Sequence, residues 1–459
     1  MEKKRGTFTG GLGFVLAAAG SAVGLGNLWR FPYLAAKHGG GVFLFVYIFM
    51  ALTFGFTLMI TEIAIGRKTG RSAIKAYAQL NKNFRFLGYL ASVIPFVIFA
   101  YYCVIGGWVM KYMADFMVGN GMQTVADGYF QGFMKSLWSP IFWMAVFMLI
   151  SAVIVYLGVD KGVEKFSKIF MPVLFVLIIG IAVFTMTLKG PHGTAFEGLA
   201  IYLIPDFTGM TVGKFFTVLL DAAGQIFYSM SIAMGIMITY GSYMPKNTNL
   251  VKSVNQIEIC DTGVALLAGM IMVPTVFIFQ GVAGLEQSGP GLLFIALPKV
   301  FEAMGFAGNF VGVAFFLLVA FAALTSSVSL LEAVVSIVVD KVPSCSRKKA
   351  CTYVLVLSLI LACVTCLGYN VLYFEYTLPN GVTGQLLDIM DYVSNNVLMP
   401  IVALATCILA GWVLKPKEMI DEIKSNGESF DRERIYAVML RYIAPFFLIL
   451  IFLSAFLTA

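Results

Sequence analysis

Long apolar blocks recur along the whole chain and are separated by short polar stretches. A helix needs roughly 20 mainly apolar residues to cross a bilayer, and most of these blocks reach that length. The stretch 283–308 is also apolar, but Gly and Pro interrupt it, so the pattern predicts a loop with a short helix there. The eleven predicted spans are 11–36, 41–66, 88–117, 139–158, 166–187, 215–243, 254–281, 309–339, 350–368, 386–413 and 438–457.

The composition excludes most other classes of protein. Hydrophobic residues make up 60% of the chain and charged residues 12%, whereas soluble domains have about 25% charged residues. The lipid bilayer is therefore a required partner, and soluble enzymes, nucleic-acid-binding proteins and secreted disulfide scaffolds are excluded. A membrane-embedded enzyme would need a catalytic dyad or a metal cluster. The chain has only two histidines and no Cys–His grouping, so we predict that it is not an enzyme.

Positive charges orient the predicted spans, because cytoplasmic loops of membrane proteins carry an excess of Lys and Arg. If the N-terminus lies in the cytoplasm, all but seven of the 31 lysines and arginines fall on the cytoplasmic side. The seven exceptions are Arg30, Lys37, Lys111, Lys135, Lys189, Lys214 and Lys299. The odd number of spans then places the C-terminus outside the cell. We expect a multi-pass protein of the cell's inner (plasma) membrane.

Two of the predicted spans are poor continuous helices. Span 1 has three glycines and an asparagine within 20–27, and span 6 has Gly224, Gln225 and the serine-containing run 229–235. The breaks lie five spans apart at corresponding positions, which is typical of transporters built from an inverted repeat. Unwound backbone at mid-membrane is tolerated where it lines a protected site, and there it can bind ions. The alternative is that the glycines only allow close helix packing.

Carboxylates inside predicted spans are candidates for function, because a bare charge there is costly. Asp261 in span 7 is expected to bind sodium; the alternative is a protonated carboxyl or one bonded to Ser or Thr. Glu62 in span 2 is expected to accept hydrogen bonds from unwound backbone; the alternative is an end-of-helix residue beside Arg67 that reaches water. Asp221 and Glu332 are weaker candidates, and Glu332 is expected to reach cytoplasmic water.

Span 8 carries adjacent hydroxyls at Thr325 and Ser326. Hydroxyls in membrane helices often bond back to the carbonyl four residues earlier, and nothing more. Sodium is a hard cation that prefers several oxygen ligands, so this pair together with nearby carbonyls would also suit a sodium site.

Three motifs resemble those of the neurotransmitter:sodium symporter family: GSAVGLGNLWRFPYLAAKHGGG, GQIFYSMS and FAALTSS. The chain looks most like bacterial eleven-span members that carry hydrophobic or aromatic amino acids, and the resemblance covers essentially the whole chain. It implies an all-α integral membrane protein with the leucine-transporter fold, in which a 5+5 inverted repeat with broken helices 1 and 6 is followed by one extra helix. The implied parts are a cytoplasmic tail (1–10), repeat one (11–187), an extracellular loop (188–214), repeat two (215–413), a cytoplasmic loop (414–437) and span 11 (438–459).

The resemblance also implies two sodium sites and a substrate site. The first sodium site would use the Ala22 carbonyl and the side chains of Asn27, Ser229 and Asp261. The second would use the carbonyls of Gly20, Val23 and Ala322 and the hydroxyls of Thr325 and Ser326. The substrate would contact Ala22, Leu25, Gly26, Ile98, Tyr102, Tyr228, Ser229, Ser231, Met234, Ser326 and Leu330.

Two gating pairs complete what the resemblance implies. Arg30 and Asp391 would form an ion pair on the outer side, above the tyrosines of the substrate site. Arg5 and Asp340 would close the inner side with the help of Tyr243. Glu62 would support the unwound backbone.

The implied function is sodium-coupled import of neutral hydrophobic L-amino acids, aromatic or branched aliphatic, by alternating access. Other members carry an acidic residue or a serine with bound chloride one turn after the position of Asp261. This chain has Ala265 there, so Asp261 supplies the negative charge and no chloride is expected. Two alternatives stay open on the same fold: a transport-inactive amino-acid sensor and a proton-coupled amino acid transporter. The oligomeric state does not follow from the sequence.

Overall fold

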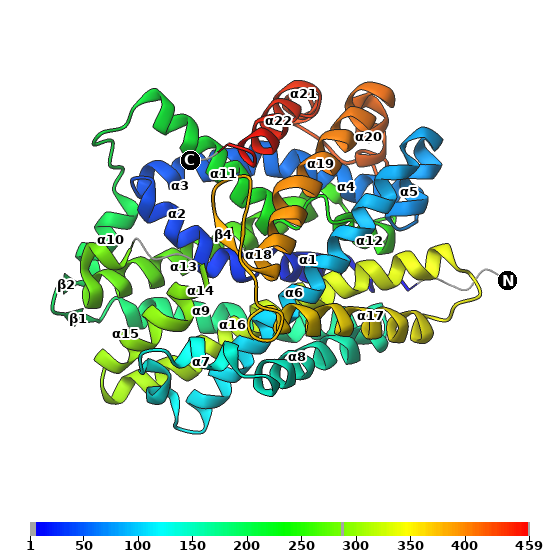
Figure 1. Cartoon of the computed structure of the whole chain (residues 1–459). Coiled ribbons are helices and arrows are strands. Elements are labelled where there is room, and N and C mark those ends of the chain that lie inside the picture. The colour runs from blue at the N-terminus through cyan, green and yellow to red at the C-terminus, as the bar shows by residue number, and fades with distance from the viewer. Residues whose placement is uncertain (1–5, 286–288, 458–459) are drawn as a thin grey trace.

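The computed structural model describes residues 6–285 and 289–457 and is built almost entirely of helices (Figure 1). Within these residues, strands occur only as two short antiparallel hairpins in connections between helices. β1 (Lys189–Gly190) pairs with β2 (Gly193–Thr194), and β3 (Tyr376–Thr377) pairs with β4 (Thr383–Gly384).

Nine continuous helical segments of the described chain are long and apolar enough to cross a membrane, and each overlaps one predicted span. These segments are α3 (Gly41–Met50), η2 (Ala51–Gly55) and α4 (Phe56–Thr69); η3 (Lys82–Phe84) and α6 (Arg85–Met117); α8 (Trp138–Tyr156); η5 (Val159–Glu164) and α9 (Lys165–Thr185); α13 (Leu250–Gly284); α16 (Phe306–Lys341); α17 (Arg347–Leu367); α18 (Leu386–Asp391), η7 (Tyr392–Leu398), α19 (Met399–Ile408) and η8 (Leu409–Val413); and α21 (Glu433–Val438), η9 (Met439–Ile443) and α22 (Ala444–Ser454).

Shorter helices fill the connections. The stretch 283–308 was predicted to be a loop with one short helix, but three helices follow one another there from Gly289 to Ala303. The connecting helices are α5 (Ala73–Leu80), η4 (Gly121–Val125), α7 (Tyr129–Lys135), α10 (Ala195–Leu203), α14 (Gly289–Gly291), η6 (Leu292–Ala296), α15 (Leu297–Ala303) and α20 (Pro416–Ile423).

The first predicted span is broken at the glycine-rich motif. α1 (Gly11–Ala22) ends where Val23 takes an extended backbone conformation, and the chain resumes as η1 (Gly26–Arg30) and α2 (Phe31–Lys37). The two halves are bent by 54° relative to each other. Counted as one span, this bent pair is the tenth candidate in the described chain.

The remaining predicted span, 215–243, is split into α11 (Val212–Ser229) and α12 (Ile236–Tyr243). In the six residues between them, Ser231, Ala233 and Gly235 have φ values of 53°, 64° and 67°. Positive φ is uncommon for residues other than glycine, so this segment is strained and depends on its surroundings. The eleven predicted spans are therefore nine continuous segments and two broken helices.

Continuous helices surround the breaks in the two helices, whereas the first turns of α11 are exposed. α1 packs against α13 and α16, α12 packs against α4, and α16 runs along α6. Figure 1 shows α1 near the middle of the molecule. This packing keeps the unwound backbone away from the outer surface of the bundle.

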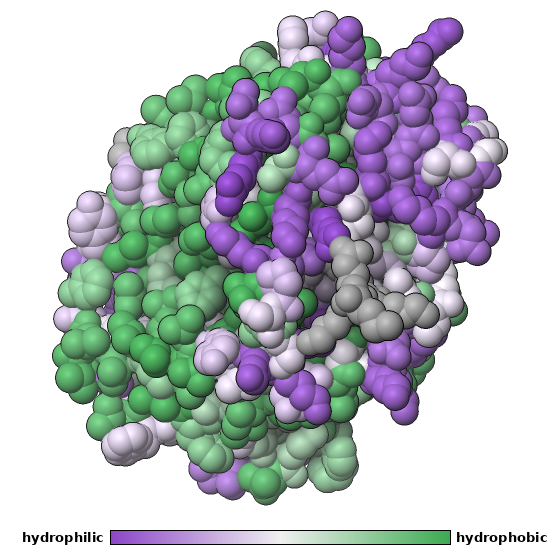
Figure 2. All heavy atoms as spheres, turned by 90° about the vertical axis from the view of Figure 1, so that its right-hand side faces the viewer, coloured by the Kyte–Doolittle hydropathy of each residue, from purple (hydrophilic) through white to green (hydrophobic). Residues whose placement is uncertain are grey.

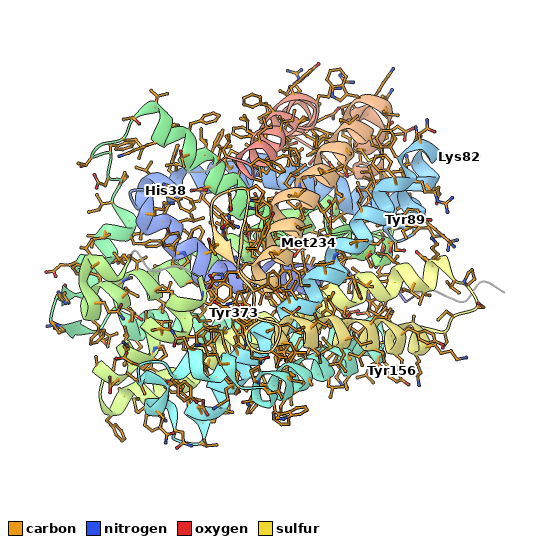
Figure 3. All side chains as sticks on the ribbon, viewed as in Figure 1. His38, Lys82, Tyr89, Tyr156, Met234 and Tyr373 are labelled. Atoms are coloured by element: carbon orange, nitrogen blue, oxygen red, sulfur yellow. The ribbon has the colours of Figure 1, made fainter. Side chains whose placement is uncertain are left out.

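The two ends of the bundle carry different residues. His38 lies toward one end in Figure 3, Lys82, Tyr89 and Tyr156 lie toward the other, and Met234 lies between them. Figure 2 shows the second of these ends, where hydrophilic side chains gather beside apolar ones. Which end faces the cytoplasm stays a prediction from the charge distribution.

α4 and α12 approach closely at two glycines. A Cβ atom on Gly66 would lie 2.0 Å from the carbonyl oxygen of Ile238, and one on Gly241 would lie 2.3 Å from the carbonyl oxygen of Ile63. Both neighbours are backbone atoms, so they cannot turn aside as a side chain can. The half-helix α12 is therefore held against α4 by direct backbone approach, as small residues allow in membrane helices.

We expect Gly241→Ala to lower the free energy of unfolding by about 1–3 kcal/mol, because the added methyl group overpacks this contact. Thermal unfolding in detergent measures the loss. Gly180→Ala in α9 is the matched control, since no atom lies within 4 Å of the position of its Cβ. Equal losses in the two variants would contradict the close-packing explanation.

Candidate functional site

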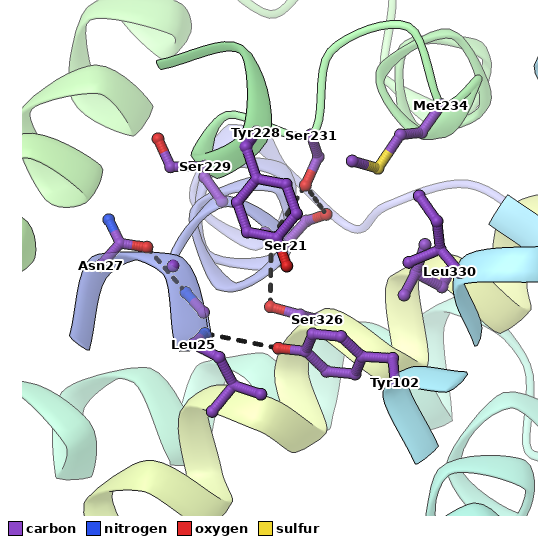
Figure 4. A pocket seen from close by; sticks show the side chains of 14 residues that line it. Ser21, Leu25, Asn27, Tyr102, Tyr228, Ser229, Ser231, Met234, Ser326 and Leu330 are labelled. Carbon is purple, nitrogen blue, oxygen red and sulfur yellow. Dashed lines mark hydrogen bonds between the residues drawn. The ribbon is translucent and has the colours of Figure 1, made fainter. Parts of the chain in front are cut away.

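A cavity lies between the two broken helices (Figure 4). It is a small cavity, with about 40 Å³ of free volume inside it. All eleven residues predicted to contact a substrate line it, and the lining is completed by Ser21, Gly24 and Asn27. Segments that are far apart in the sequence therefore surround one space.

One end of the cavity presents backbone from the break in span 1. The Leu25 N–H donates to the Tyr102 hydroxyl over 3.5 Å, and η1 begins at the next residue, so its positive N-terminal end lies here. A Cβ atom on Gly24 would lie 2.8 Å from Ser326 Oγ and would fill this end. Backbone donors, a hydroxyl and a helix N-terminus together suit a carboxylate.

The rest of the cavity is mostly apolar. Met234 and Leu330 lie together on one side, and Ile98 also lines the space. Ser21 and Ser231 face each other with their hydroxyl oxygens 3.0 Å apart, and the Ser231 hydroxyl also lies 3.0 Å from the Ser21 carbonyl. No charged side chain of the described chain lines the cavity. The arrangement suits a ligand with a carboxylate at one end and an uncharged, mainly apolar group at the other.

Asp261 in α13 is fully buried and joins three helices. Its carboxylate accepts hydrogen bonds from Asn27 Nδ2 at 2.7 Å, Ser229 Oγ at 3.2 Å and the Tyr47 hydroxyl at 3.3 Å. Two of the other predicted ligands of the first sodium site, Asn27 and Ser229, thus contact Asp261, and the fourth, Ala22, lines the adjoining cavity. On its other side, Asn27 Oδ1 accepts a hydrogen bond of 3.0 Å from the Gly24 N–H.

The predicted ligands of the second sodium site also lie together. Ser326 Oγ is 3.1 Å from the Val23 carbonyl oxygen and 3.5 Å from that of Gly20, so it bonds across to span 1. Thr325 instead bonds back within its own helix, with its hydroxyl 3.1 Å from the Phe321 carbonyl oxygen four residues earlier and 3.0 Å from that of Ala322. The back-bonding alternative therefore holds for one hydroxyl of the pair and not for the other.

Both candidate ion sites depend on oxygen atoms that are mostly neutral. The described chain contains no group of three His, Cys, Asp or Glu side chains that could hold a metal ion. Carbonyls, hydroxyls and one carboxylate suit a hard monovalent cation better than a transition metal.

Three polar residues of this region were not predicted. Tyr47 donates to Asp261, Ser21 lines the cavity, and Gln225 Nε2 donates to the Gly26 carbonyl at 3.1 Å. Tyr47 lies in an otherwise apolar stretch of span 2, so an isolated hydroxyl is the only signal that the sequence offers. Ser21 and Gln225 fall inside the recognised motifs, which did not indicate a contact for either side chain.

Glu62 is buried in α4, and its Oε1 accepts a hydrogen bond of 2.7 Å from the Ala233 N–H. Ala233 is one of the strained residues between α11 and α12. The carboxylate therefore meets unwound backbone, as expected for this residue, and does not reach water at the end of a helix.

Arg30 and Asp391 do not form an ion pair in this conformation, although both belong to the described chain. Asp391 instead accepts hydrogen bonds from the Tyr101 hydroxyl at 2.9 Å and from Asn395 Nδ2 at 2.6 Å. The Arg30 guanidinium lies 5.8 Å from the centre of the Tyr228 ring. In this conformation each of the two side chains has other partners.

The predicted inner pair is only partly described, because Arg5 lies outside the described residues. Asp340 accepts hydrogen bonds from the Ser72 backbone N–H at 2.7 Å and from its hydroxyl at 2.6 Å. The Tyr243 hydroxyl donates to Glu332 at 2.7 Å.

Glu332 does not reach water, so that expectation was wrong. Its side chain is fully buried and pairs with Arg347, whose Nη1 is 3.0 Å from Glu332 Oε1. A basic side chain from the start of α17 thus covers the carboxylate. Asp221, the other weaker candidate, lies 2.6 Å from His38 Nε2.

Comparisons with known proteins give one consistent result. The family model described as "Sodium:neurotransmitter symporter family" matches residues 5–121 and 133–459. The sodium-dependent transporter YhdH of Bacillus subtilis, itself uncharacterised, is 34% identical, over 99% of this chain and 98% of its own length. The human sodium- and chloride-dependent GABA transporter 2 is 27% identical, over 92% of this chain and 77% of its own.

A solved structure is similar over the whole fold. The crystal structure of MhsT in complex with L-phenylalanine has a TM-score of 0.85 and 34% sequence identity. The match covers 99% of this chain and 100% of that one. The predicted leucine-transporter fold is thereby confirmed.

We expect Glu62→Ala to destabilise the protein by about 1–3 kcal/mol, because it leaves the buried Ala233 N–H without an acceptor. Glu62→Gln keeps an acceptor oxygen at this position and should lose less. Thermal unfolding of the two variants in detergent tests the contact. If the glutamine variant lost as much stability as the alanine variant, the hydrogen bond would not be the reason that Glu62 matters.

Proposed function

Since the chain belongs to the sodium:neurotransmitter symporter family, we propose that it imports neutral hydrophobic L-amino acids, aromatic or branched aliphatic, by sodium-coupled alternating access. As a member of that family it is a sodium-dependent transporter and not an enzyme. The cavity between the broken helices carries the proposal. It offers a polar end, an apolar remainder and a buried carboxylate beside it.

The proposed substrate class rests on the lining of the cavity. An acidic or basic side chain would find no partner of opposite charge there, and burying it would be costly. An amine without a carboxylate would leave the donors around Leu25 and Tyr102 unused. A similar protein of known structure holds L-phenylalanine, which has the features that this cavity suits.

Coupling would arise at Asp261. A sodium ion between Asp261, Asn27, Ser229 and the Ala22 carbonyl would replace the hydrogen bonds that now join these side chains. The substrate carboxylate would add a further oxygen to the same ion. Sodium and substrate would then raise each other's affinity by the same factor.

The second sodium ion would join span 1 to span 8, through Gly20, Val23, Ala322, Thr325 and Ser326. Its role would be to fix the break in span 1 in the form that binds substrate. The contact of Ser326 with two of these carbonyls supports this assignment, because the oxygen atoms already lie close together.

Alternating access would open and close two ends of this cavity. Arg30 and Asp391 would pair when the outer end closes, and Asp340 with Arg5 would act at the inner end. The distribution of Lys and Arg supports a cytoplasmic N-terminus and an external C-terminus. The division into two repeats of five spans, 11–187 and 215–413, belongs to the same proposal, with both broken helices at the start of a repeat.

We expect L-phenylalanine, L-tryptophan or L-leucine to bind the purified protein only when sodium is present. Asp261→Asn and Asn27→Ala should each raise the half-saturating sodium concentration roughly tenfold or more, a loss of about 1.4 kcal/mol. Radiolabelled ligand binding at varied sodium concentration measures both.

Two results would contradict the proposal in different ways. Binding that ignores sodium and follows pH would make the protein a proton-coupled transporter. Sodium-dependent binding without counterflow in proteoliposomes would make it a sensor.

We also propose that transport is independent of chloride, because Asp261 supplies the negative charge and Ala265 offers no ligand one turn later. Replacing external chloride by gluconate should leave sodium-driven uptake of L-phenylalanine unchanged in proteoliposomes. Replacing external sodium by choline in the same vesicles should abolish the uptake and serves as the control. Loss of uptake in gluconate would overturn this assignment.

A further inference from the structure

Glu258 in α13 is a buried carboxylate that the proposed transport cycle does not use. The residue is 3% exposed, and no hydrogen bond from the described chain reaches its Oε1. A charged carboxylate in this position is costly unless a cation or a proton neutralises it. The buried side chain therefore indicates that something neutralises it at least during part of the cycle.

Two further oxygen atoms without partners flank Glu258 on the same helix. Asn255 Oδ1 and Thr262 Oγ1 are both shielded from solvent and lack a hydrogen-bond partner in the described chain. They lie three residues before and four residues after Glu258, so all three side chains share one face of α13. Unpartnered buried oxygen atoms are rare in proteins. These three form a column along one face of α13 about 10 Å long, with Glu258 between the other two.

The charged groups around Glu258 in the described chain offset its charge only in part, because none of them forms an ion pair with it. Asp261 and Arg432 are the charged side chains close enough to act on it electrostatically, and Tyr47 lies within range of both carboxylates. Arg432 is engaged elsewhere, with its guanidinium 3.3 Å from the Leu52 carbonyl oxygen and 4.9 Å from the Phe56 ring centre. Asp261 is itself negative, which increases the need for a cation.

We propose that Glu258, with Asn255 and Thr262, forms a third cation position beside the Asp261 site and takes a monovalent cation, either sodium or a proton. The proposal rests on the proposed sodium-coupled function. Two carboxylates on adjacent turns compete for positive charge, because a cation at one repels a cation at the other. A cation at Glu258 therefore weakens the binding of sodium at Asp261. The affinity for sodium is restored when the cation at Glu258 leaves toward the Leu250 end of α13.

Glu258→Gln keeps the size of the side chain and removes its charge. The expected result for this variant depends on whether the cation is sodium or a proton. If the cation is sodium, the variant binds one ion fewer per protein in equilibrium binding of radioactive sodium. If it is a proton, raising the pH from 6 to 9 removes it from the wild type and strengthens sodium binding. The half-saturating sodium concentration then falls roughly threefold more in the wild type than in the variant, which has no proton to lose at this position. Either result supports the third position and identifies its ion.

Controls separate the site from general effects. Glu418→Gln removes an exposed carboxylate in α20 and should leave sodium binding and its pH dependence unchanged. Asn255→Ala and Thr262→Val test the column if the Glu258 variant does not fold. Each should lower the number of bound sodium ions or reduce the pH dependence of sodium binding, as expected for Glu258→Gln.

One result for Glu258→Gln would contradict the third cation position. If Glu258→Gln folds and keeps both the number of bound sodium ions and the pH dependence of the wild type, Glu258 is a structural carboxyl and the third position does not exist. The same holds if the two column variants fold and leave both readouts unchanged. If the wild type itself shows no sodium-dependent ligand binding, the proposed function fails instead, so the two failures are distinguishable.

Discussion

Every backbone polar group inside a bilayer must be satisfied by the protein, and the structure depends on how this is achieved at two broken helices. In span 6, Glu62 accepts the hydrogen bond of the strained Ala233. In span 1, Gln225 donates to the Gly26 carbonyl and Ser326 lies against the Val23 carbonyl. Side chains from the surrounding helices thus stabilise backbone that lipid could not. The same side chains hold the unwound segments in place around the cavity.

The buried carboxylate of Asp261 must also be satisfied by the protein, in the same way as the unwound backbone. Its three donors come from three different spans, so the carboxylate fixes the relative positions of Asn27, Ser229 and Tyr47. A cation that replaced these hydrogen bonds would take over the same structural role. Ion binding and the arrangement of the broken helices are then one event, which is what coupling between an ion and a substrate requires.

The breaks could be predicted because weak helix propensity is encoded in short contiguous stretches. The lining of the cavity followed instead from the family resemblance, since Ile98, Tyr102 and Leu330 lie outside the quoted motifs. Gly20 to Asn27 show weak helix propensity directly. The contact of Tyr47 with Asp261 joins spans 2 and 7, and no local pattern in either span indicates it. Glu332 was misjudged because the depth of a side chain depends on what covers it, here Arg347 from the next helix. Contacts between helices decide such cases, and periodicity within one helix does not.

In the proposed outer gate, Arg30 and Asp391 would each have to give up contacts that they make in this conformation. Asp391 is already hydrogen-bonded to Tyr101 and Asn395, and the Arg30 guanidinium already faces the Tyr228 ring. Forming the ion pair would exchange these contacts for another one, so the net gain is the difference between two sets of favourable interactions. Such an exchange can be reversed in each cycle by the differential binding of an ion or a substrate. A carboxylate without alternative partners would pay a large penalty in the open state, and the gate would stay shut.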